Sequence, residues 1–151
     1  MAADLDAQVI AFVRQVVGAM GLDLSVDVEE REDNVRLNLG GESADVLLRR
    51  NGEALDALQV IVNTVFRRDA RGDRHYVVDA LGFREGKDAE LRQMAGFLMD
   101  KVKTTGLPQE MGPLNPYARR IVHLTVAEDD DLTSESMGDA FLKSVVISKK
   151  K

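Results

Sequence analysis

The sequence predicts an α+β protein made of two small domains, and three observations lead to this expectation. Apolar residues recur with the period of a helix in three long segments, at 4–20, 53–68 and 89–105. They alternate with the period of a strand in shorter segments, at 24–29, 35–39, 75–81 and 141–147. Between the two halves, at 82–88, glycine and charged residues interrupt the apolar pattern and indicate a boundary.

The composition is that of an ordinary soluble protein without disulfides. Of the 151 residues, 44% are hydrophobic and 30% are charged, and no apolar run is long enough to cross a bilayer. The N-terminus lacks the basic and apolar blocks of a signal peptide, so we expect a cytoplasmic protein with no membrane span. The absence of cysteine excludes disulfides, zinc sites with thiolate ligands and cysteine nucleophiles.

The net charge of −6 argues mildly against a nucleic-acid partner, but the charge is unevenly distributed. Residues 1–83 hold nine arginines and fifteen acidic residues, whereas residues 84–151 hold eleven basic and eleven acidic ones. Arginines also cluster locally, at Arg49-Arg50, at Arg67, Arg68, Arg71 and Arg74, and at Arg119-Arg120. A phosphate backbone responds to such local patches as well as to the total charge.

The elements expected in the first half follow the order α-β-β-α-α-β. The first helix carries one apolar stripe and is stopped by Gly21; the stripe consists of Leu5, Val9, Phe12, Val13, Val16, Val17 and Met20. A hairpin with one wet face follows, turning at Asp33-Asn34. A short helical turn at 44–48, the helix at 53–68, a polar loop at 69–73 and a strand at 75–81 complete this half.

In the second half we expect the helix at 89–105, a strand at 107–112 and a helix that starts after Asn115. A closing hairpin follows, with strands at 132–138 and 141–147 and a frayed tail at 149–151. The acidic run Glu128–Asp131 and the lone Asp79 show no paired acid–base geometry, so we expect both to be solvated.

The helix after Asn115 carries the main candidate site. Asn115 is a typical N-cap and Pro116 a typical first helical residue, while Tyr117, Ile121 and Leu124 are expected on its buried face. Arg119 and His123 are four residues apart and share a second, polar face. A guanidinium beside a titratable imidazole near a helix start suits a phosphate, although the same spacing also occurs on a solvated face with a surface histidine.

Two segments together resemble a known family. The stretch Leu48-Arg49-Arg50-Asn51-Gly52, followed by Leu55-Asp56-Ala57-Leu58-Gln59, resembles the loop and helix of a bacterial KH domain of the type II topology. The stretch Leu114–Leu124 is similar to the helix of an R-3-H domain, which is named for its Arg-x-x-x-His pair. In this order they resemble the Jag family of sporulation-associated RNA-binding proteins, also called KhpB, over about residues 22–147.

The resemblance implies a type II KH domain over residues 1–83 and an R-3-H domain, with a linking helix and a three-stranded sheet, over 84–151. It implies non-catalytic binding of single-stranded RNA or DNA and a role in post-transcriptional control linked to cell-envelope growth or sporulation. A small KH-domain protein is an expected partner, and the oligomeric state stays open. The extra N-terminal domain usual in the family is not in this sequence, so we expect a short member or a trimmed form.

The resemblance also assigns binding roles in the second half. Arg119 and His123 would form the core of the site, and Arg120 points about 100° away from Arg119 on a helix, so it either flanks the site or pairs with an acid. Ser136 and Gly138 match a Thr-x-Ser-x-Gly-like turn that would complete an anion pocket. Lys143 stands where the family often has arginine, and Glu135 where it often has an aromatic, which removes a stacking surface.

The KH-like loop departs from the family's Gly-x-x-Gly pattern, since Arg49 stands at the first glycine while Gly52 keeps the second. Arg49 and its neighbours Arg50 and Asn51 either grip a phosphate or belong to a degenerate loop kept only as a connection. No metal site, cofactor or enzyme motif is expected. The alternative function is a protein-interaction adaptor with little nucleic-acid binding, for which the acidity, Arg49 and Glu135 argue.

Overall fold

The computed structural model describes residues 2–69 and 75–151. This described part holds four α-helices, one short 3-10 helix and six strands, and the strands form two three-stranded sheets. The predicted α+β class is therefore confirmed. The chain divides into two compact units, Met1–Arg84 and Glu85–Lys151. Most of the predicted loop at 69–73, with Arg71 and also Arg74, lies outside the described residues.

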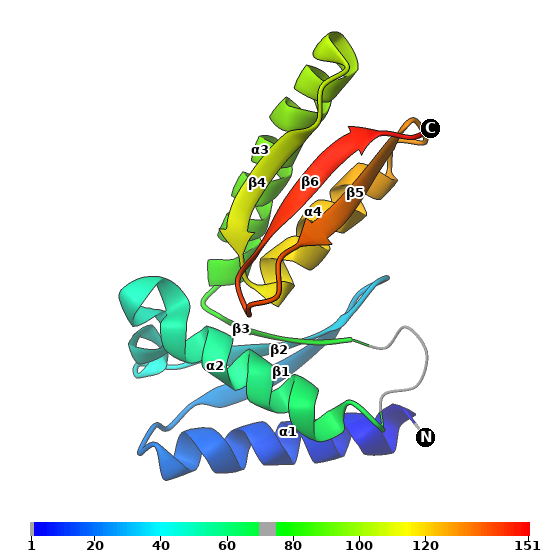
Figure 1. The fold of residues 1–151 in the computed structure, drawn as a ribbon. Coiled ribbons are helices and arrows are strands. Elements are labelled where there is room, and N and C mark those ends of the chain that lie inside the picture. Colours follow the sequence, from blue (N-terminus) through cyan, green and yellow to red (C-terminus); the bar gives the residue numbers. More distant parts are fainter. Residues whose placement is uncertain (1, 70–74) are drawn as a thin grey trace. The chain divides into compact units, whose positions relative to one another are not determined.

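The first unit has the predicted element order. It consists of α1 (Ala2–Ala19), β1 (Ser25–Glu30), β2 (Val35–Gly40), η1 (Ala44–Leu48), α2 (Arg49–Phe66) and β3 (Tyr76–Ala80). Strands β1 and β2 are antiparallel, as in the expected hairpin, whereas β2 and β3 are parallel. A parallel pair needs a crossover, which η1 and α2 supply. Helices α1 and α2 cover one face of the sheet (Figure 1).

The core of this unit lies between the two helices and the sheet. The apolar stripe of α1 is buried at every fourth residue, at Leu5, Val9, Val13 and Val17. On α2 the ring of Phe66 meets Phe12 edge-on, with 5.5 Å between the ring centroids. The helical periods in the sequence therefore identified the contacts that close this core.

The expected wet face of the hairpin is wrong for β2, the central strand. Arg36 is buried on β2, and its Nη1 lies 3.1 Å from Oδ2 of Asp79 on β3. Oδ1 of Asp79 accepts the backbone N–H groups of Ala80 and Arg84, at 2.7 and 2.9 Å. The expectation that Asp79 is solvated is also wrong, because these partners replace water around a buried carboxylate.

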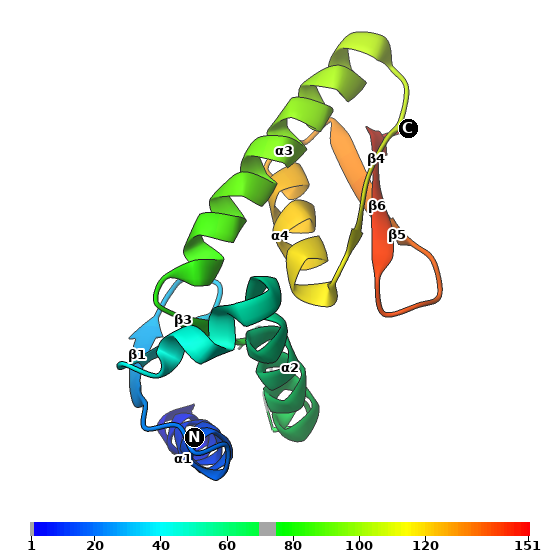
Figure 2. The same ribbon diagram turned by 90° about the vertical axis from the view of Figure 1, so that its left-hand side faces the viewer.

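The second unit contains most of α3 (Phe83–Thr105), then β4 (Gln109–Leu114), α4 (Pro116–Ala127), β5 (Leu132–Met137) and β6 (Lys143–Lys149). Its sheet is antiparallel with the order β4-β6-β5. Helices α3 and α4 lie on one face of this sheet (Figure 2). The buried residues between them are Ala95, Val102, Met111, Val122, Val126, Leu132, Val145 and Ile147.

Several boundaries in this unit differ from the prediction. Helix α3 starts at Phe83 rather than 89, because Gly82 makes the turn (φ +69°) and Asp79 accepts the N–H of Arg84 in the first helical turn. The tail is not frayed at Lys149, which belongs to β6, and the Lys150 N–H donates to the carbonyl of Asp131 at 2.9 Å. The charged residues in both places read as loop although they are helix and strand.

The acidic run and the buried face of α4 also need correction. Asp129 is not simply solvated, because it forms an ion pair with Lys103 of α3. That hydrogen bond lowers the pKa of Asp129 and raises the pKa of Lys103. On α4, Leu124 is exposed, while Val122 and Val126 join Ile121 in the interior. The predicted stripe of α4 is therefore on the wrong side of the helix at its C-terminal end.

Candidate nucleic-acid interface

The start of α4 has the capped geometry that the sequence predicts. The side-chain oxygen of Asn115 accepts the N–H of Ala118 at 2.8 Å, and Pro116 occupies the first helical position. On the opposite side of the turn, the Tyr117 hydroxyl donates to Oδ2 of Asp88 on α3 at 2.8 Å. These contacts fix the helix end, so the side chains of Arg119 and His123 start from a rigid element.

Arg119 ties together two backbone segments at this end of the sheet. Its Nη1 donates to the carbonyl of Leu114, at the end of β4, at 2.7 Å. The same atom donates to the carbonyl of Phe141, in the loop between β5 and β6, at 2.8 Å. Within residues 2–69 and 75–151 the Nε and Nη2 groups have no hydrogen-bond partner. The guanidinium therefore keeps N–H donors for an external acceptor.

His123 is held between two serines of β5. Its Nδ1 lies 2.6 Å from Oγ of Ser134, and its Nε2 lies 2.9 Å from Oγ of Ser136. Burial first, and then the positive charge of Arg119, lower the pKa of His123 below its usual value. The imidazole is therefore neutral at pH 7, with one ring nitrogen donating to a serine and the other accepting from one.

Protonation of His123 would change what the two serines offer. In the imidazolium both ring nitrogens donate, so both hydroxyl oxygens act as acceptors toward the ring. The hydroxyl protons of Ser134 and Ser136 are then both available to an anion. The ring, the two hydroxyls and Arg119 therefore form a donor set that gains one donor when the ring takes up a proton.

The structure brings five of the predicted residues to one end of this sheet: Arg119, His123, Ser136, Gly138 and Lys143. Ser136 lies within β5 rather than in a turn, and Gly138 follows the strand with φ +126°. A Cβ on Gly138 would lie 3.6 Å from Cγ of Lys143, so the two residues are neighbours. Arg120 is half-buried and lies about 100° around the helix from Arg119, away from His123.

Ser134 was missed by the sequence reasoning and Glu135 was misjudged. Residues two apart on a strand share a face, so Ser134 could have been found from Ser136. Glu135 points to the opposite face of the sheet, where β6 places Val146 between it and Glu110. An aromatic residue at position 135 would therefore not lie beside His123, and its absence removes nothing from that side.

The KH-like loop of the first unit has an unusual backbone. Arg50, Asn51 and Gly52 all have left-handed dihedrals, with φ of 53°, 59° and 81°. Each such non-glycine residue is strained by about 1 kcal/mol or more, and strain of this kind gathers at functional sites. Arg49 has φ −60° and ψ 149°, which any residue adopts, so arginine at the first glycine position adds no backbone strain.

Gly52 has a second reason to be glycine. A Cβ at this position would lie 2.6 Å from Cε1 of Phe83, so the Phe83 ring packs directly on the backbone of the loop. Gly52 is buried, whereas Arg49, Arg50 and Asn51 are exposed. The glycine therefore shapes and anchors the loop, and the three residues before it present their side chains to solvent.

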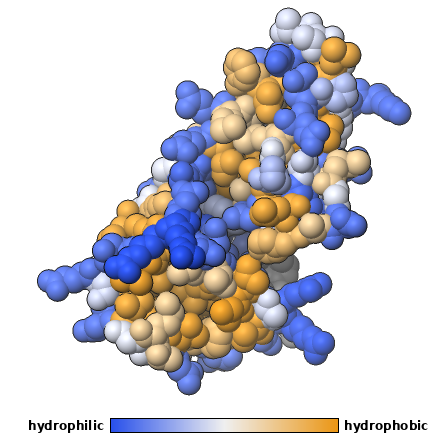
Figure 3. Space-filling view, turned by 60° about the vertical axis from the view of Figure 1, so that its left-hand side comes forward, coloured by the Kyte–Doolittle hydropathy of each residue, from blue (hydrophilic) through white to orange (hydrophobic). Residues whose placement is uncertain are grey.

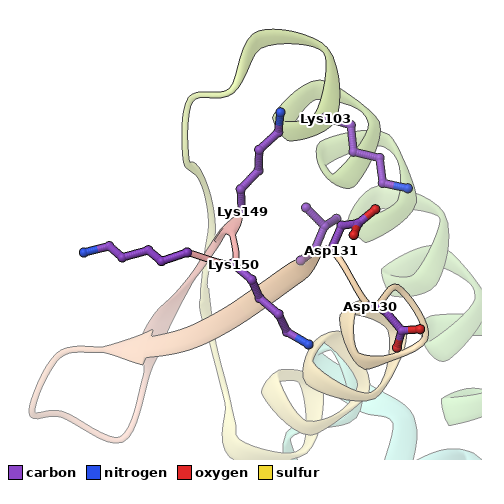
Figure 4. Close-up of a pocket in the computed structure, with 7 residues that line it drawn as sticks. Lys103, Asp130, Asp131, Lys149 and Lys150 are labelled. Carbon is purple, nitrogen blue, oxygen red and sulfur yellow. The ribbon is translucent and has the colours of Figure 1, made fainter.

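A hollow of about 620 Å³ lies elsewhere on the second unit, and the sequence reasoning did not identify it (Figure 4). It is lined by Lys103, Asp130, Asp131, Leu132, Lys149, Lys150 and Lys151. The lysines and aspartates around it are of opposite sign, and Lys103 is already paired with Asp129. This mixed charge makes the hollow a weaker anion site than the Arg119 end of the sheet.

Two further searches of the described residues gave no candidates. No group of three or more histidine, cysteine or acidic side chains in this part of the chain has the arrangement of a metal site. No described helix combines the length and apolar character of a membrane span.

An Arg-x-x-x-His helix packed on the serine face of a three-stranded sheet defines an R-3-H domain, and residues 89–149 match the family model of that domain. The chain is also similar to curated proteins over nearly its whole length. RNA-binding protein KhpB of Clostridium symbiosum is 32% identical over 149 residues, which cover 97% of this chain and 67% of that protein. The chain therefore belongs to the KhpB, or Jag, family.

Two other relatives carry the same name. RNA-binding protein KhpB of Bacillus subtilis is 27% identical over 142 residues, 93% of this chain and 68% of the relative. The protein of that name from Lactiplantibacillus plantarum is 23% identical over 140 residues, 93% of this chain but 44% of the relative. The alignments cover both units, so the likeness is not confined to the R-3-H domain.

Proposed function

We propose that this chain binds single-stranded RNA, and also single-stranded DNA, without catalysis. The site is the end of the second sheet formed by Arg119, His123, Ser134, Ser136, Gly138 and Lys143, called here the α4–β5 site. The observation that carries the proposal is the Arg119 guanidinium, anchored by two carbonyls with donors to spare, beside the serine-bound His123. The names of the relatives, which call them RNA-binding proteins, support it.

The chemistry of the α4–β5 site suits a phosphate group. The free N–H groups of Arg119 match two phosphate oxygens, and a half-buried cation is screened less by water than an exposed one. Ser134 and Ser136 add hydroxyl donors, and Lys143 adds a second charge at the start of β6. These groups recognise a backbone rather than base edges, so binding at this site should depend only weakly on sequence.

The first unit would be a type II KH domain over residues 1–83, followed by the R-3-H domain with its linking helix over 84–151. Its loop at Arg49, Arg50 and Asn51 would make a second, weaker contact through exposed arginines, with Gly52 setting the backbone. Such a protein would act in the cytoplasm in post-transcriptional control linked to cell-envelope growth or sporulation. A small KH-domain protein would be its partner.

Binding of a labelled single-stranded RNA, followed by fluorescence anisotropy at several salt concentrations, tests the proposal. The logarithm of the affinity should fall with the logarithm of salt at a slope near −0.7 per phosphate contact. Arg119→Ala combined with His123→Ala should weaken binding at least tenfold, whereas Arg92→Ala, an equal loss of charge at an exposed position on α3, should not. Unchanged affinity in the double variant would show that the site is assigned wrongly.

A protein-interaction adaptor is the second candidate, because α2 exposes an apolar face. Val60, Ile61 and Val65 are 40–48% exposed. Figure 3 shows apolar surface over the first unit, broken by charged side chains. Partners that remain bound after nuclease treatment and are lost in Val65→Glu, with no RNA crosslinking to the chain, would favour this function over RNA binding.

A further inference from the structure

The loop that joins β5 to β6 exposes large apolar side chains next to the α4–β5 site. Met137, Phe141 and Leu142 are 51%, 55% and 52% exposed. All three lie at the tip of the hairpin, where β5 ends at Met137 and β6 begins at Lys143. A phenylalanine left half in water at a loop tip gains little from burial, so its presence points to a ligand that covers it.

Arg119 fixes the position of Phe141. Its Nη1 donates to the Phe141 carbonyl at 2.8 Å, so the backbone that carries the ring is bound to the guanidinium. The same nitrogen holds the end of β4 through the Leu114 carbonyl. The ring is therefore within one side-chain length of a cation that has donors available, on a loop anchored to a helix start.

A nucleotide presents a phosphate and a flat aromatic base at a separation of this order. We propose that Phe141 stacks on a base of the single strand whose phosphate Arg119 binds. This inference rests on the proposed function of the α4–β5 site and adds to it the group that holds the base. Stacking needs only the flat face of the base, so Phe141 should add affinity for every base and discriminate weakly among them.

The other aromatic residues of the second unit are less suited to this role. Tyr117 is half-buried, and its hydroxyl is bonded to Asp88. Phe97 is 67% exposed but belongs to α3, and no contact joins it to Arg119 in the described part of the chain. The sheet face around Glu135 and Glu110 is acidic and would repel a phosphate backbone. Phe141 is thus the aromatic side chain tied to the cation.

The test compares two labelled oligonucleotides of equal length, one of single-stranded RNA and one in which abasic units replace the bases. Phe141→Ala should weaken binding of the RNA by about 5- to 150-fold, the range for loss of one base stack, and leave the abasic strand unaffected. Phe97→Ala, which removes an equally exposed ring from the same unit, should change neither affinity. Arg119→Ala should weaken both strands. Circular dichroism establishes that the variants are folded.

The chain has no tryptophan, so Phe141→Trp introduces a single reporter. Its fluorescence should be quenched by the RNA but not by the abasic strand, and Phe97→Trp should not respond. If the wild type binds RNA and Phe141→Ala binds it equally well, or loses affinity equally for both strands, the stacking role is wrong while the proposed function stands. If the wild type binds neither strand, both are wrong.

Discussion

Arg119 and His123 have two duties each at the scale of the single residue. Arg119 holds the carbonyls of Leu114 and Phe141, and His123 bridges the hydroxyls of Ser134 and Ser136. Both side chains are therefore structural before any ligand arrives, which keeps their remaining donors in place and lowers the entropy lost on binding. A substitution at either position should affect stability as well as affinity, so the two have to be measured separately.

The lowered pKa of His123 predicts a pH dependence of stability. Below the ordinary histidine pKa of about 6.5 the unfolded chain takes up a proton before the folded one does, so stability falls as the pH drops toward the native pKa. We expect the free energy of unfolding in urea to fall more between pH 7.5 and 5.5 in the wild type than in His123→Gln. His75→Gln, at the other histidine, is the control. Equal pH slopes in the wild type and His123→Gln would contradict this prediction.

Gly52 offers a test of the loop geometry. Gly52→Ala combines a left-handed backbone with a Cβ 2.6 Å from the Phe83 ring, so it should destabilise the protein by about 1–3 kcal/mol. Gly86→Ala is the matched control, since no atom would lie within 4 Å of its Cβ on α3. In a helix this second change should stabilise by about 0.5–1 kcal/mol. A Gly52→Ala protein as stable as the wild type would rule out the packing of Phe83 on the loop.

At the scale of the element, α4 depends on its N-terminal cap. Asn115→Ala removes the side-chain acceptor of the Ala118 N–H and should destabilise the protein by about 1 kcal/mol, measured by urea unfolding. Asn115→Asp keeps an acceptor at the same place and should retain most of the stability. If both variants were equally unstable, the loss would come from the other contacts of Asn115 rather than from the cap.

The sequence predicts the elements better than their environments. Helical and strand periods give the order of both units, and the Asn115-Pro116 pair gives the start of α4 to the residue. Arg36 and Asp79 could not be recognised as buried, because a charge reads as wet until its partner, 43 residues away, is known. The start of α3 was lost for a similar reason, since its first turn is charged and is stabilised by the distant Asp79.

The candidate site shows the same limit. The Arg119–His123 spacing identified the helix face, but Ser134 became visible only when β5 was seen to pair its serines with the imidazole. The role of Phe141 depends on a hydrogen bond between residues 22 positions apart, which no local pattern contains. Position 135 was assigned to the wrong side, because a family likeness gives the residue type and not the face of the sheet.

At the scale of the whole molecule, an acidic chain is proposed to bind an acidic polymer. The net charge of −6 comes from residues 1–83, whereas residues 84–151 balance. Within the second sheet the charges separate by face, with Arg119 beside the serine face of β5 and Glu135 and Glu110 on the opposite face. A local arrangement of this kind supports phosphate binding even when the total charge opposes it, and it should make the affinity steeply dependent on salt.

The most direct test of the α4–β5 site is a titration of the ¹⁵N-labelled wild-type chain with a short single-stranded RNA, followed by the backbone amide resonances. This experiment needs no substitution, so it separates binding from the structural duties of Arg119 and His123. The account predicts that the largest shifts cluster at residues 115–123 and 134–143, with smaller ones at 49–52. Shifts confined to other surfaces, such as the exposed face of α2, or no shifts at all, would contradict it.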